Sequence, residues 1–360
     1  MVVAIVDKTV LTNAGQEHVS FNWILLQEKF TKTNKELYDQ SQDYYGFFPG
    51  INKNFELKGL ERFSSQQLDK LSEDADLAYI TDAYGIYKNE WYEKGDEKER
   101  SGIVYGGMSD QDIEFLSGMK NKHKLVISEF NCLGSPTSPI IRLKFQEVFG
   151  IGWTGWIGRY FDSFDTTINK ELPKWLIRNY KAQHKGAWPF KKSGVAFVHS
   201  DDRVVILEKD IDLIEEYPKI VSNQEGQSGY KLPKKLEYTF WFDIVEYDKN
   251  VNHTIADFNI NATDRGIKIL EQSGIPSSFP AITLHNHSDY QFYYFSADFS
   301  DNPIDLGTAY LKFIPKLSRF FYNRRDPMDR KAFFWEIYQP LVTTILKNNY
   351  KKIKGDHLDK

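Results

Sequence analysis

Short apolar runs alternate with segments of helical spacing through the first half of the chain. Three continuous apolar runs, at residues 2–6, 77–80 and 125–128, are typical of strands that are buried on both faces of a sheet. Helices are predicted after the second and third runs, with Ser109 and Ser138 as N-caps, because a serine hydroxyl accepts a hydrogen bond from the first helical turn. This alternation predicts an α/β fold with an open, mainly parallel sheet and helices on both of its faces.

The pattern changes near residues 211–232, which are polar and interrupted by glycine. We therefore predict two parts. An α/β domain covers residues 1–210, and an α+β region covers residues 211–360 and could pack with the first part as one unit. The second part is predicted to contain strands first and helices afterwards, at residues 238–247, 255–260, 281–299, 307–321 and 327–349.

The last predicted helix carries a stripe of apolar side chains at helical spacing, formed by Phe333, Phe334, Ile337, Leu341, Ile345 and Leu346. We expect this helix to start after Asp326 as its N-cap and to kink at Pro340, which has no backbone N–H to donate. Its polar face is not strongly basic, so we expect it to pack on its own chain rather than on a membrane. An oligomer that assembles through these aromatic helices is an alternative.

Composition narrows the class of protein. Of the 360 residues, 41% are hydrophobic and 27% are charged, which is typical of a folded globular chain. The net charge of -4 and the pI of about 6.1 create no basic field, so no nucleic-acid partner is expected. No stretch is apolar for long enough to span a membrane. From the sequence as written we expect a cytoplasmic protein, or an extracytoplasmic one if an N-terminal leader or anchor has been removed.

The third apolar run and the segments after it resemble a known unit. Residues 125–128, the loop 131–138, the helix to Phe149 and the Gly150-Ile151 that follows are similar to the last βαβ unit of class I glutamine amidotransferase-like domains. ThuA-like proteins and the trimerisation domain of certain β-galactosidases, which are non-catalytic versions, are the most similar. The resemblance implies a flavodoxin-like sheet over residues 1–210.

Three other segments, at residues 5–9, 43–49 and 153–160, are similar to an uncharacterised bacterial family to which we attach no activity. Amidotransferase-like domains often accompany carbohydrate-active modules. The resemblance therefore implies a role related to carbohydrates, by association rather than from a motif.

Cys132 is the single cysteine, so the sequence allows no internal disulfide and no multi-cysteine metal site. In an active amidotransferase, small residues stand two positions to either side of the cysteine nucleophile, but here Phe130 stands two before it. His184 is followed by Lys185 rather than by the expected His-x-Glu pattern. No catalytic triad is evident. We interpret Cys132 as an inert, partly buried thiol whose replacement by serine costs no more than about 1 kcal/mol.

Acidic residues stand at the ends of the three predicted buried strands: Asp7, Asp82 and Glu129. Parallel strands end at the same edge of a sheet, and ligands of open α/β sheets bind outside these carboxyl ends. We therefore expect the three side chains to share one pocket. Asp82 and Glu129 are the candidate catalytic residues, because two carboxylates can act as acid and base on a glycosidic bond. The alternative is that the carboxylates cap helices or pair with Lys8 and Arg159.

The other candidate ligand-binding residues are aromatic, amide and basic side chains near the same strand ends. Tryptophan faces beside carboxylates and an arginine are typical of carbohydrate sites, although tryptophan packed over glycine in a core is an alternative. The complete set of ligand-binding candidates is Asp7, Lys8, Tyr84, Asn131, Trp153, Trp156 and Arg159.

No cofactor and no metal site is predicted. His285 and His287 could share one face of a strand, but the pattern offers no third ligand. Neither a Walker A loop nor a G-x-G-x-x-G motif occurs, so nucleotide binding has no support.

Two functions are compatible with these patterns. One is non-catalytic and the other is enzymatic, so the sequence does not decide whether the protein is an enzyme. The first is a non-catalytic or accessory protein that binds carbohydrate or a partner in cell-envelope polysaccharide metabolism. The second is a hydrolase that acts on glycans through Asp82 and Glu129. Carboxyl groups roughly 5–10 Å apart across an open cleft would favour the hydrolase, whereas burial against a cation would indicate a structural role. A carbohydrate ligand and a homo-oligomer are the partners we consider.

Overall fold

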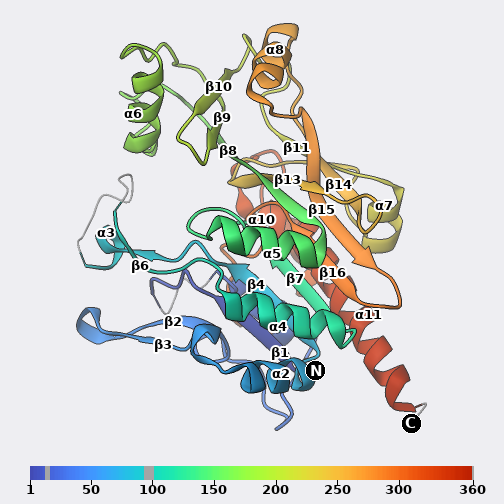
Figure 1. Ribbon diagram of the computed structural model, residues 1–360. Coiled ribbons are helices and arrows are strands. Elements are labelled where there is room, and N and C mark those ends of the chain that lie inside the picture. The colour runs from blue at the N-terminus through green and yellow to red at the C-terminus, as the bar shows by residue number, and fades with distance from the viewer. Residues whose placement is uncertain (13–16, 93–100, 359–360) are drawn as a thin grey trace.

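A ten-stranded mixed sheet runs through the computed structural model, which describes residues 1–12, 17–92 and 101–358 (Figure 1). The five strands from β16 to β2 pair in parallel, and the strands outside them pair antiparallel. The predicted α/β fold with a mainly parallel central sheet is confirmed. The strands lie in the order β12 (Lys235–Glu237), β11 (Lys219–Ser222), β14 (His253–Asn259), β15 (Ser278–Asn286), β16 (Gln291–Phe295), β7 (Leu125–Glu129), β4 (Leu77–Asp82), β1 (Val3–Asp7), β2 (Tyr45–Pro49) and β3 (Phe55–Leu57).

β16 belongs to the parallel centre although it comes from the second half of the sequence. It pairs with β7 along its whole length, from Gln291 opposite Leu125 to Phe295 opposite Glu129. The segment predicted as strand at residues 281–299 is thus mostly the hairpin of β15 and β16. The domain boundary at residue 210 stays a prediction. Strands from both sides of this boundary belong to the same ten-stranded sheet.

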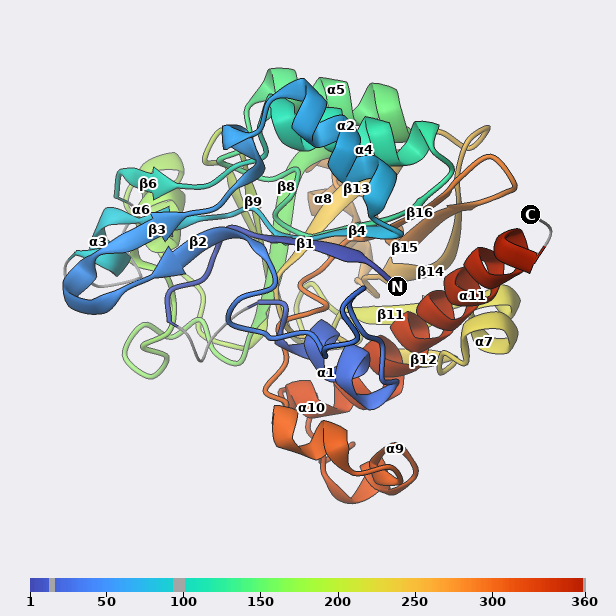
Figure 2. The same cartoon turned by 90° about the horizontal axis from the view of Figure 1, so that it is seen from below.

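The central strands are buried on both faces because their side chains alternate between two cores. In β1, Val3 and Ile5 contact one core, and Ala4 and Val6 contact the other. Figure 2 shows the helical layers on the two faces of the sheet. One layer contains α2 (Ser65–Asp74), α4 (Asp110–Asn121) and α5 (Pro139–Phe149), and the other contains α1 (Val19–Gln27), α10 (Arg330–Phe333) and α11 (Gln339–Leu358).

The predicted helix starts are confirmed at both serines. The hydroxyl of Ser109 accepts a hydrogen bond from the N–H of Asp112, and that of Ser138 accepts one from Ile141. α5 ends at Gly150, whose φ of 67° is a left-handed conformation that glycine adopts without strain. The next residue begins a long strand, so this helix end fixes where the tryptophan-rich segment starts.

That tryptophan-rich segment belongs to a second, antiparallel sheet with the order β10 (Val204–Glu208), β9 (Gly194–His199), β8 (Ile151–Phe161) and β13 (Phe242–Tyr247). The backbone N–H of Asp243 donates to the carbonyl of Ser296 at 3.0 Å and so joins β13 to the main sheet. Before residue 300, the other elements are the strand pair β5 (Ile86–Tyr87) and β6 (Ile103–Tyr105), the helices α3 (Lys88–Trp91), α6 (Lys174–Gln183), α7 (Gln224–Tyr230) and α8 (Asp264–Ser273), and the turns η1 (Ile51–Lys53) and η2 (Leu60–Arg62).

The C-terminal helix packs inside the molecule, as expected. Phe334, Ile337 and Leu341 are fully buried, and the ring of Phe334 meets that of Trp23 of α1 edge-on at 5.2 Å. A π-helical turn, η5 (Phe334–Tyr338), separates α10 from α11. This widened turn lies just before Pro340, where a missing N–H interrupts the hydrogen-bond ladder, so the helix is irregular where a kink was predicted.

Two predictions about this region are wrong. Asp329 caps α10, whereas Asp326 accepts a hydrogen bond from Met328 in the turn before it. Residues 307–321 do not form one helix, because Pro315 is tolerated only in the first turn of a helix and therefore breaks the segment. The segment contains three short helices instead, η3 (Leu306–Tyr310), α9 (Ile314–Leu317) and η4 (Ser318–Phe320).

We predict that Leu341→Ala lowers the free energy of unfolding by about 3 kcal/mol, because it leaves a cavity in a fully packed core. The matched control is Leu143→Ala on α5, a position that is 59% exposed and should lose less than about 1 kcal/mol. Urea denaturation of both variants measures the difference. Equal losses would mean that α11 is not part of the cooperative core.

Candidate functional site

The carboxyl ends of the parallel strands bring three acidic residues to one edge of the sheet. β1, β4 and β7 are neighbours and end at Asp7, Asp82 and Glu129. Asp7 and Asp82 are register partners, and Thr9 joins their side chains: its N–H donates to Asp7 at 3.0 Å and its hydroxyl donates to Asp82 at 2.8 Å. The three carboxylates nevertheless have different partners, and these partners determine what each one can do.

Asp7 is fully buried, and its partners lie inside the protein. Its Oδ2 lies 2.6 Å from Nδ1 of His18, and Nε2 of His18 lies 2.9 Å from the carbonyl of Gln40. His18 is the residue directly before α1 and is also fully buried. Asp7 therefore holds the start of α1 against β1 and presents no surface to a ligand.

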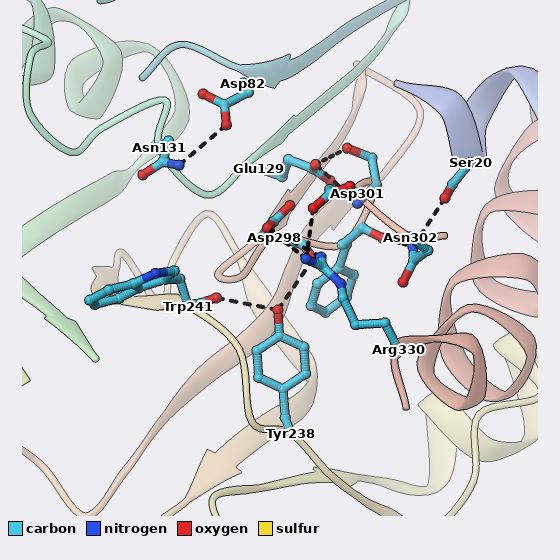
Figure 3. A network of polar contacts seen from close by, with 12 residues as sticks. Ser20, Asp82, Glu129, Asn131, Tyr238, Trp241, Asp298, Asp301, Asn302 and Arg330 are labelled. Carbon is cyan, nitrogen blue, oxygen red and sulfur yellow. Dashed lines mark hydrogen bonds and ion pairs between the residues drawn. The ribbon is translucent and has the colours of Figure 1, made fainter. Parts of the chain in front are cut away.

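Asp82 lies closer to the surface than the other two carboxylates and is 6% exposed. Burial raises its pKa to about 8, although hydrogen bonds from the N–H of Tyr84 and the hydroxyl of Thr9 favour the ionised form and oppose the shift. The amide nitrogen of Asn131 lies 3.3 Å from its Oδ2 (Figure 3). Burial therefore favours the neutral form of this carboxyl group, so this strand end carries less negative charge than its composition suggests.

Glu129 is fully enclosed. Its carboxylate accepts hydrogen bonds from the hydroxyl of Tyr79 at 2.7 Å and from both the N–H and the hydroxyl of Ser300. Burial raises the pKa of this carboxyl well above its usual value, and the hydrogen bonds from Ser300 and Tyr79 oppose the shift only in part. Glu129 thus links β7 to the loop after β16 and has no contact with solvent.

Three further carboxylates, which the sequence patterns did not identify, lie at the same edge: Glu17, Asp298 and Asp301. One oxygen from each lies within 4.8 Å of the others, a spacing at which carboxylates could hold a cation. The guanidinium of Arg330 already pairs with two of them, at 3.1 Å from Asp298 and 2.7 Å from Asp301 (Figure 3). We therefore assign no metal to this cluster.

A cavity of about 470 Å³ opens beside this edge. Three of the predicted ligand-binding residues line it, namely Tyr84 and Asn131, which follow β4 and β7, and Trp153 in β8. The sequence patterns missed other parts of its wall, because these come from the 84–90 segment, the first turn of α6 and the end of β9. The missed residues include Tyr87, Glu90, Trp175, His199 and Ser200.

Two backbone irregularities position this wall. β8 and β13 shift register between Trp153 and Ile157, where Gly155 has a φ of 93°. A Cβ atom on Gly155 would lie 2.5 Å from Nε2 of His199, so only glycine lets His199 keep its place. Asn131 has a φ of 68°, a left-handed conformation that asparagine tolerates better than most residues.

Two predicted candidates in β8 lie away from this cavity. Trp156 lines a separate cavity of about 460 Å³, consistent with residues three apart in a strand facing opposite sides. The guanidinium of Arg159 lies over the rings of Phe161 and Trp241, at 5.1 and 5.7 Å from their centroids. Neither Trp156 nor Arg159 therefore lines the cavity that Trp153 lines, although the indole N–H of Trp153 donates to the carbonyl of Trp156 at 3.1 Å.

Lys8 also lies elsewhere and is fully buried. Its ammonium group is 2.6 Å from the carboxylate of Asp112, pairs closely with Glu61, and donates to the carbonyl of Gly107 at 3.0 Å. These contacts join β1 to α4 and account for all the hydrogen atoms of the ammonium group. Lys8 is thus engaged within the protein.

Cys132 is more deeply buried than expected. It is 0% exposed in the core beneath α4 and α5, and its Sγ lies 3.6 Å from the carbonyl of Ile80. Burial raises the pKa of the thiol well above its usual value, which disfavours the nucleophilic thiolate. The loss of unfolding free energy that we expected for Cys132→Ser was therefore too small. A hydroxyl group in this apolar core should cost about 1–3 kcal/mol rather than less than about 1.

A second cavity, of about 620 Å³, opens elsewhere, beside the amino ends of β1 and β2. It is lined by Val2, Tyr44, Tyr45 and Arg62, among others. We place the candidate site in the smaller cavity, because ligands of open α/β sheets bind at the carboxyl ends of the strands.

Comparisons with known proteins found structures of similar fold, but neither a family model nor a curated protein that matches. No family model matches the chain, and no curated protein matches it. Among solved structures, the chain is similar to a glutamine amidotransferase from Thermotoga maritima, with 9% identity, a TM-score of 0.37 and 97% of both chains covered. It is also similar to a ThuA-like protein from Bacteroides uniformis, with 7% identity, a TM-score of 0.35 and 82% of both chains covered.

A β-galactosidase from Bacillus circulans is similar as well, with 10% identity and a TM-score of 0.35 over 83% of this chain. The chain spans 29% of the length of that enzyme. These three proteins belong to the groups that the sequence resembles, but at these identities and TM-scores no residue role is transferred from them. Among the described residues, no helix combines the length and the apolarity that crossing a bilayer requires.

We predict that Asp82→Asn becomes more stable relative to the wild type as the pH rises. The folded-state pKa of about 8 lies above the usual value of 3.8, so the wild type loses stability between these two values as the carboxyl group is forced to ionise. Asparagine carries no such group. The variant should gain at least about 1 kcal/mol over the wild type between about pH 5 and about pH 8.5.

Urea denaturation at the two pH values measures this gain. Asp69→Asn, at an exposed position on α2, is the control and should show no pH-dependent difference from the wild type. A pH-independent difference for Asp82→Asn would mean that the carboxyl of Asp82 is ionised throughout.

Proposed function

We propose that the protein binds a neutral glycan in the 470 Å³ cavity at the carboxyl edge, as a non-catalytic or accessory protein of cell-envelope polysaccharide metabolism. The observation that carries this proposal is the make-up of the cavity wall, in which aromatic rings stand beside amide, imidazole and hydroxyl groups. Sugars have apolar C–H faces that pack on rings and hydroxyl groups that need hydrogen-bond partners. The rings are those of Tyr84, Tyr87, Trp153 and Trp175.

The charge of the wall favours a neutral ligand. Among the described residues that line the cavity, Glu90 and His199 are the ionisable groups besides the tyrosines, and neither lysine nor arginine is present. Nδ1 of His199 lies 2.7 Å from the carboxylate of Asp201. The described lining residues therefore offer a phosphate or an acidic sugar no guanidinium or ammonium group, although the guanidinium of Arg142 lies over the ring of Trp153 at 4.4 Å from its centroid.

Asn131 is the polar group best placed to orient a ligand. Its amide nitrogen is directed at Asp82, and Figure 3 shows its amide oxygen pointing away from Asp82. Because one end of the amide is held in this way, the oxygen is a fixed acceptor for a sugar hydroxyl. A fixed acceptor supports binding, since less conformational entropy is lost when the ligand arrives.

Hydrolysis is the less favoured function. A glycosidase normally places two carboxyl groups on either side of the bond that it cleaves. Glu129 is fully buried behind Tyr79 and Ser300, and neither Glu129 nor Asp82 is among the residues that line the cavity. The second candidate function would thus require the carboxyl edge to open.

We predict that a glycan-array screen finds neutral oligosaccharides as ligands and that Tyr84→Ala weakens the best of them about tenfold, because an aromatic contact is lost. Calorimetric titration with the selected oligosaccharide measures the affinity. The matched control is Tyr310→Ala, which removes an exposed tyrosine outside the cavity and should leave the affinity unchanged.

Two results would contradict the proposal. One is an array on which neutral glycans do not bind, and the other is equal affinity of the wild type and Tyr84→Ala. The same titration mixture also tests hydrolysis, through the release of new reducing ends. If the wild type cleaves the bound glycan and Asp82→Asn does not, the hydrolase replaces the binding protein as the function.

A further inference from the structure

Exposed apolar side chains gather in one stretch of the chain that the proposed glycan site does not use. Residues 306–325, which we call the lobe, contain η3, α9 and η4. Figure 2 shows the α9 region projecting beyond α1 and α10, away from the sheet. Apolar patches of this kind mark interaction surfaces. Six large apolar side chains of the lobe are exposed: Tyr310, Leu311, Phe313, Leu317, Phe320 and Phe321.

The lobe is also basic, although the protein as a whole is acidic. Residues 306–325 contain five cationic side chains and no aspartate or glutamate, whereas the chain has a net charge of -4. Arg324 pairs with Glu336 at 3.1 Å, and no described carboxylate lies within ion-pair distance of the other four. The five exposed cations are Lys312, Lys316, Arg319, Arg324 and Arg325.

Contacts near both ends of the lobe hold it in place. The indole N–H of Trp23 donates to the hydroxyl of Thr308 at 2.8 Å, and the hydroxyl of Tyr322 donates to Glu336 at 2.9 Å. Between these contacts Ile314 is buried. The lobe is thus tied to α1 and to the C-terminal helix, and its exposed rings lie between the two attachments.

We propose that the lobe binds the surface of a membrane that contains anionic phospholipids. Aromatic and leucine side chains partition into the boundary between headgroups and acyl chains, while lysine and arginine reach the phosphate groups around them. Each cation near an anionic leaflet adds to the binding free energy, so five cations, four of them without a carboxylate partner among the described residues, suit this surface. Such binding needs no spanning helix.

Charge and shape favour a membrane over a protein partner. A two-fold contact between copies of the lobe would place five cations against five cations, which repel one another. Protein interfaces deplete lysine at their centres, but here cations alternate with exposed rings along the sequence. A projecting lobe can also enter a headgroup layer without a complementary groove on the other side.

Co-sedimentation of the full chain with vesicles tests the proposal. One preparation contains phosphatidylcholine alone, and the other contains equimolar phosphatidylcholine and phosphatidylglycerol. We expect the protein to sediment with the anionic vesicles and to be released at high salt. Phe320→Ser, at a position that is 84% exposed, should weaken binding about tenfold. Lys316→Gln combined with Arg319→Gln should weaken it about twentyfold or more.

Ile51→Ser is the matched control, because Ile51 is 83% exposed outside the lobe and its replacement should leave vesicle binding unchanged. Circular dichroism confirms that each variant folds. The proposal is overturned if the wild type does not sediment with anionic vesicles at low salt, or if the lobe variants bind like the control. A dimer that Phe320→Ser makes monomeric, without any vesicle binding, would assign the lobe to self-association instead.

Discussion

Buried carboxyl groups at one edge of the sheet govern how the strand ends pack against the loop after β16 and the C-terminal helices. An ionised carboxylate leaves water at a high cost unless a cation or hydrogen-bond donors replace the water. Arg330 pairs with Asp298 and Asp301, and internal donors face Asp82 and Glu129. Because Arg330 belongs to α10, the C-terminal helices contribute directly to this edge. The strand ends, the loop after β16 and these helices are therefore held together by one set of polar contacts.

Features that are decided by neighbouring residues could be predicted from the sequence. Each of the three apolar runs is a parallel strand, and each ends in the predicted acidic residue, as Asp82 illustrates. Ser109 and Ser138 cap their helices because capping depends on a few adjacent residues. The cavity beside Tyr84 and Asn131 follows from the rule that ligands approach open sheets at these strand ends.

Features that depend on distant segments could not be predicted in this way. The patterns do not show that β16 enters the sheet beside β7, or that Arg330 reaches the carboxyl edge. Nor could Trp175 and His199 be assigned to the cavity wall, because the residues around them do not indicate where α6 and β9 pack. Trp156 could have been separated from Trp153, since residues three apart in an extended strand face opposite sides.

Our main conclusion is that the carboxyl groups at this edge are buried away from water, beside a cavity whose described lining contains neither lysine nor arginine. The protonation state of Asp82 is the sharpest test of this conclusion. Carbon-13 NMR of the side-chain carboxyl, with Asp82→Asn used to assign the signal, follows its titration in the intact protein. Burial predicts a titration midpoint near the pKa of about 8, far above the usual 3.8. A midpoint below about 5 would show a hydrated, ionised carboxylate at this strand end and would contradict the claim.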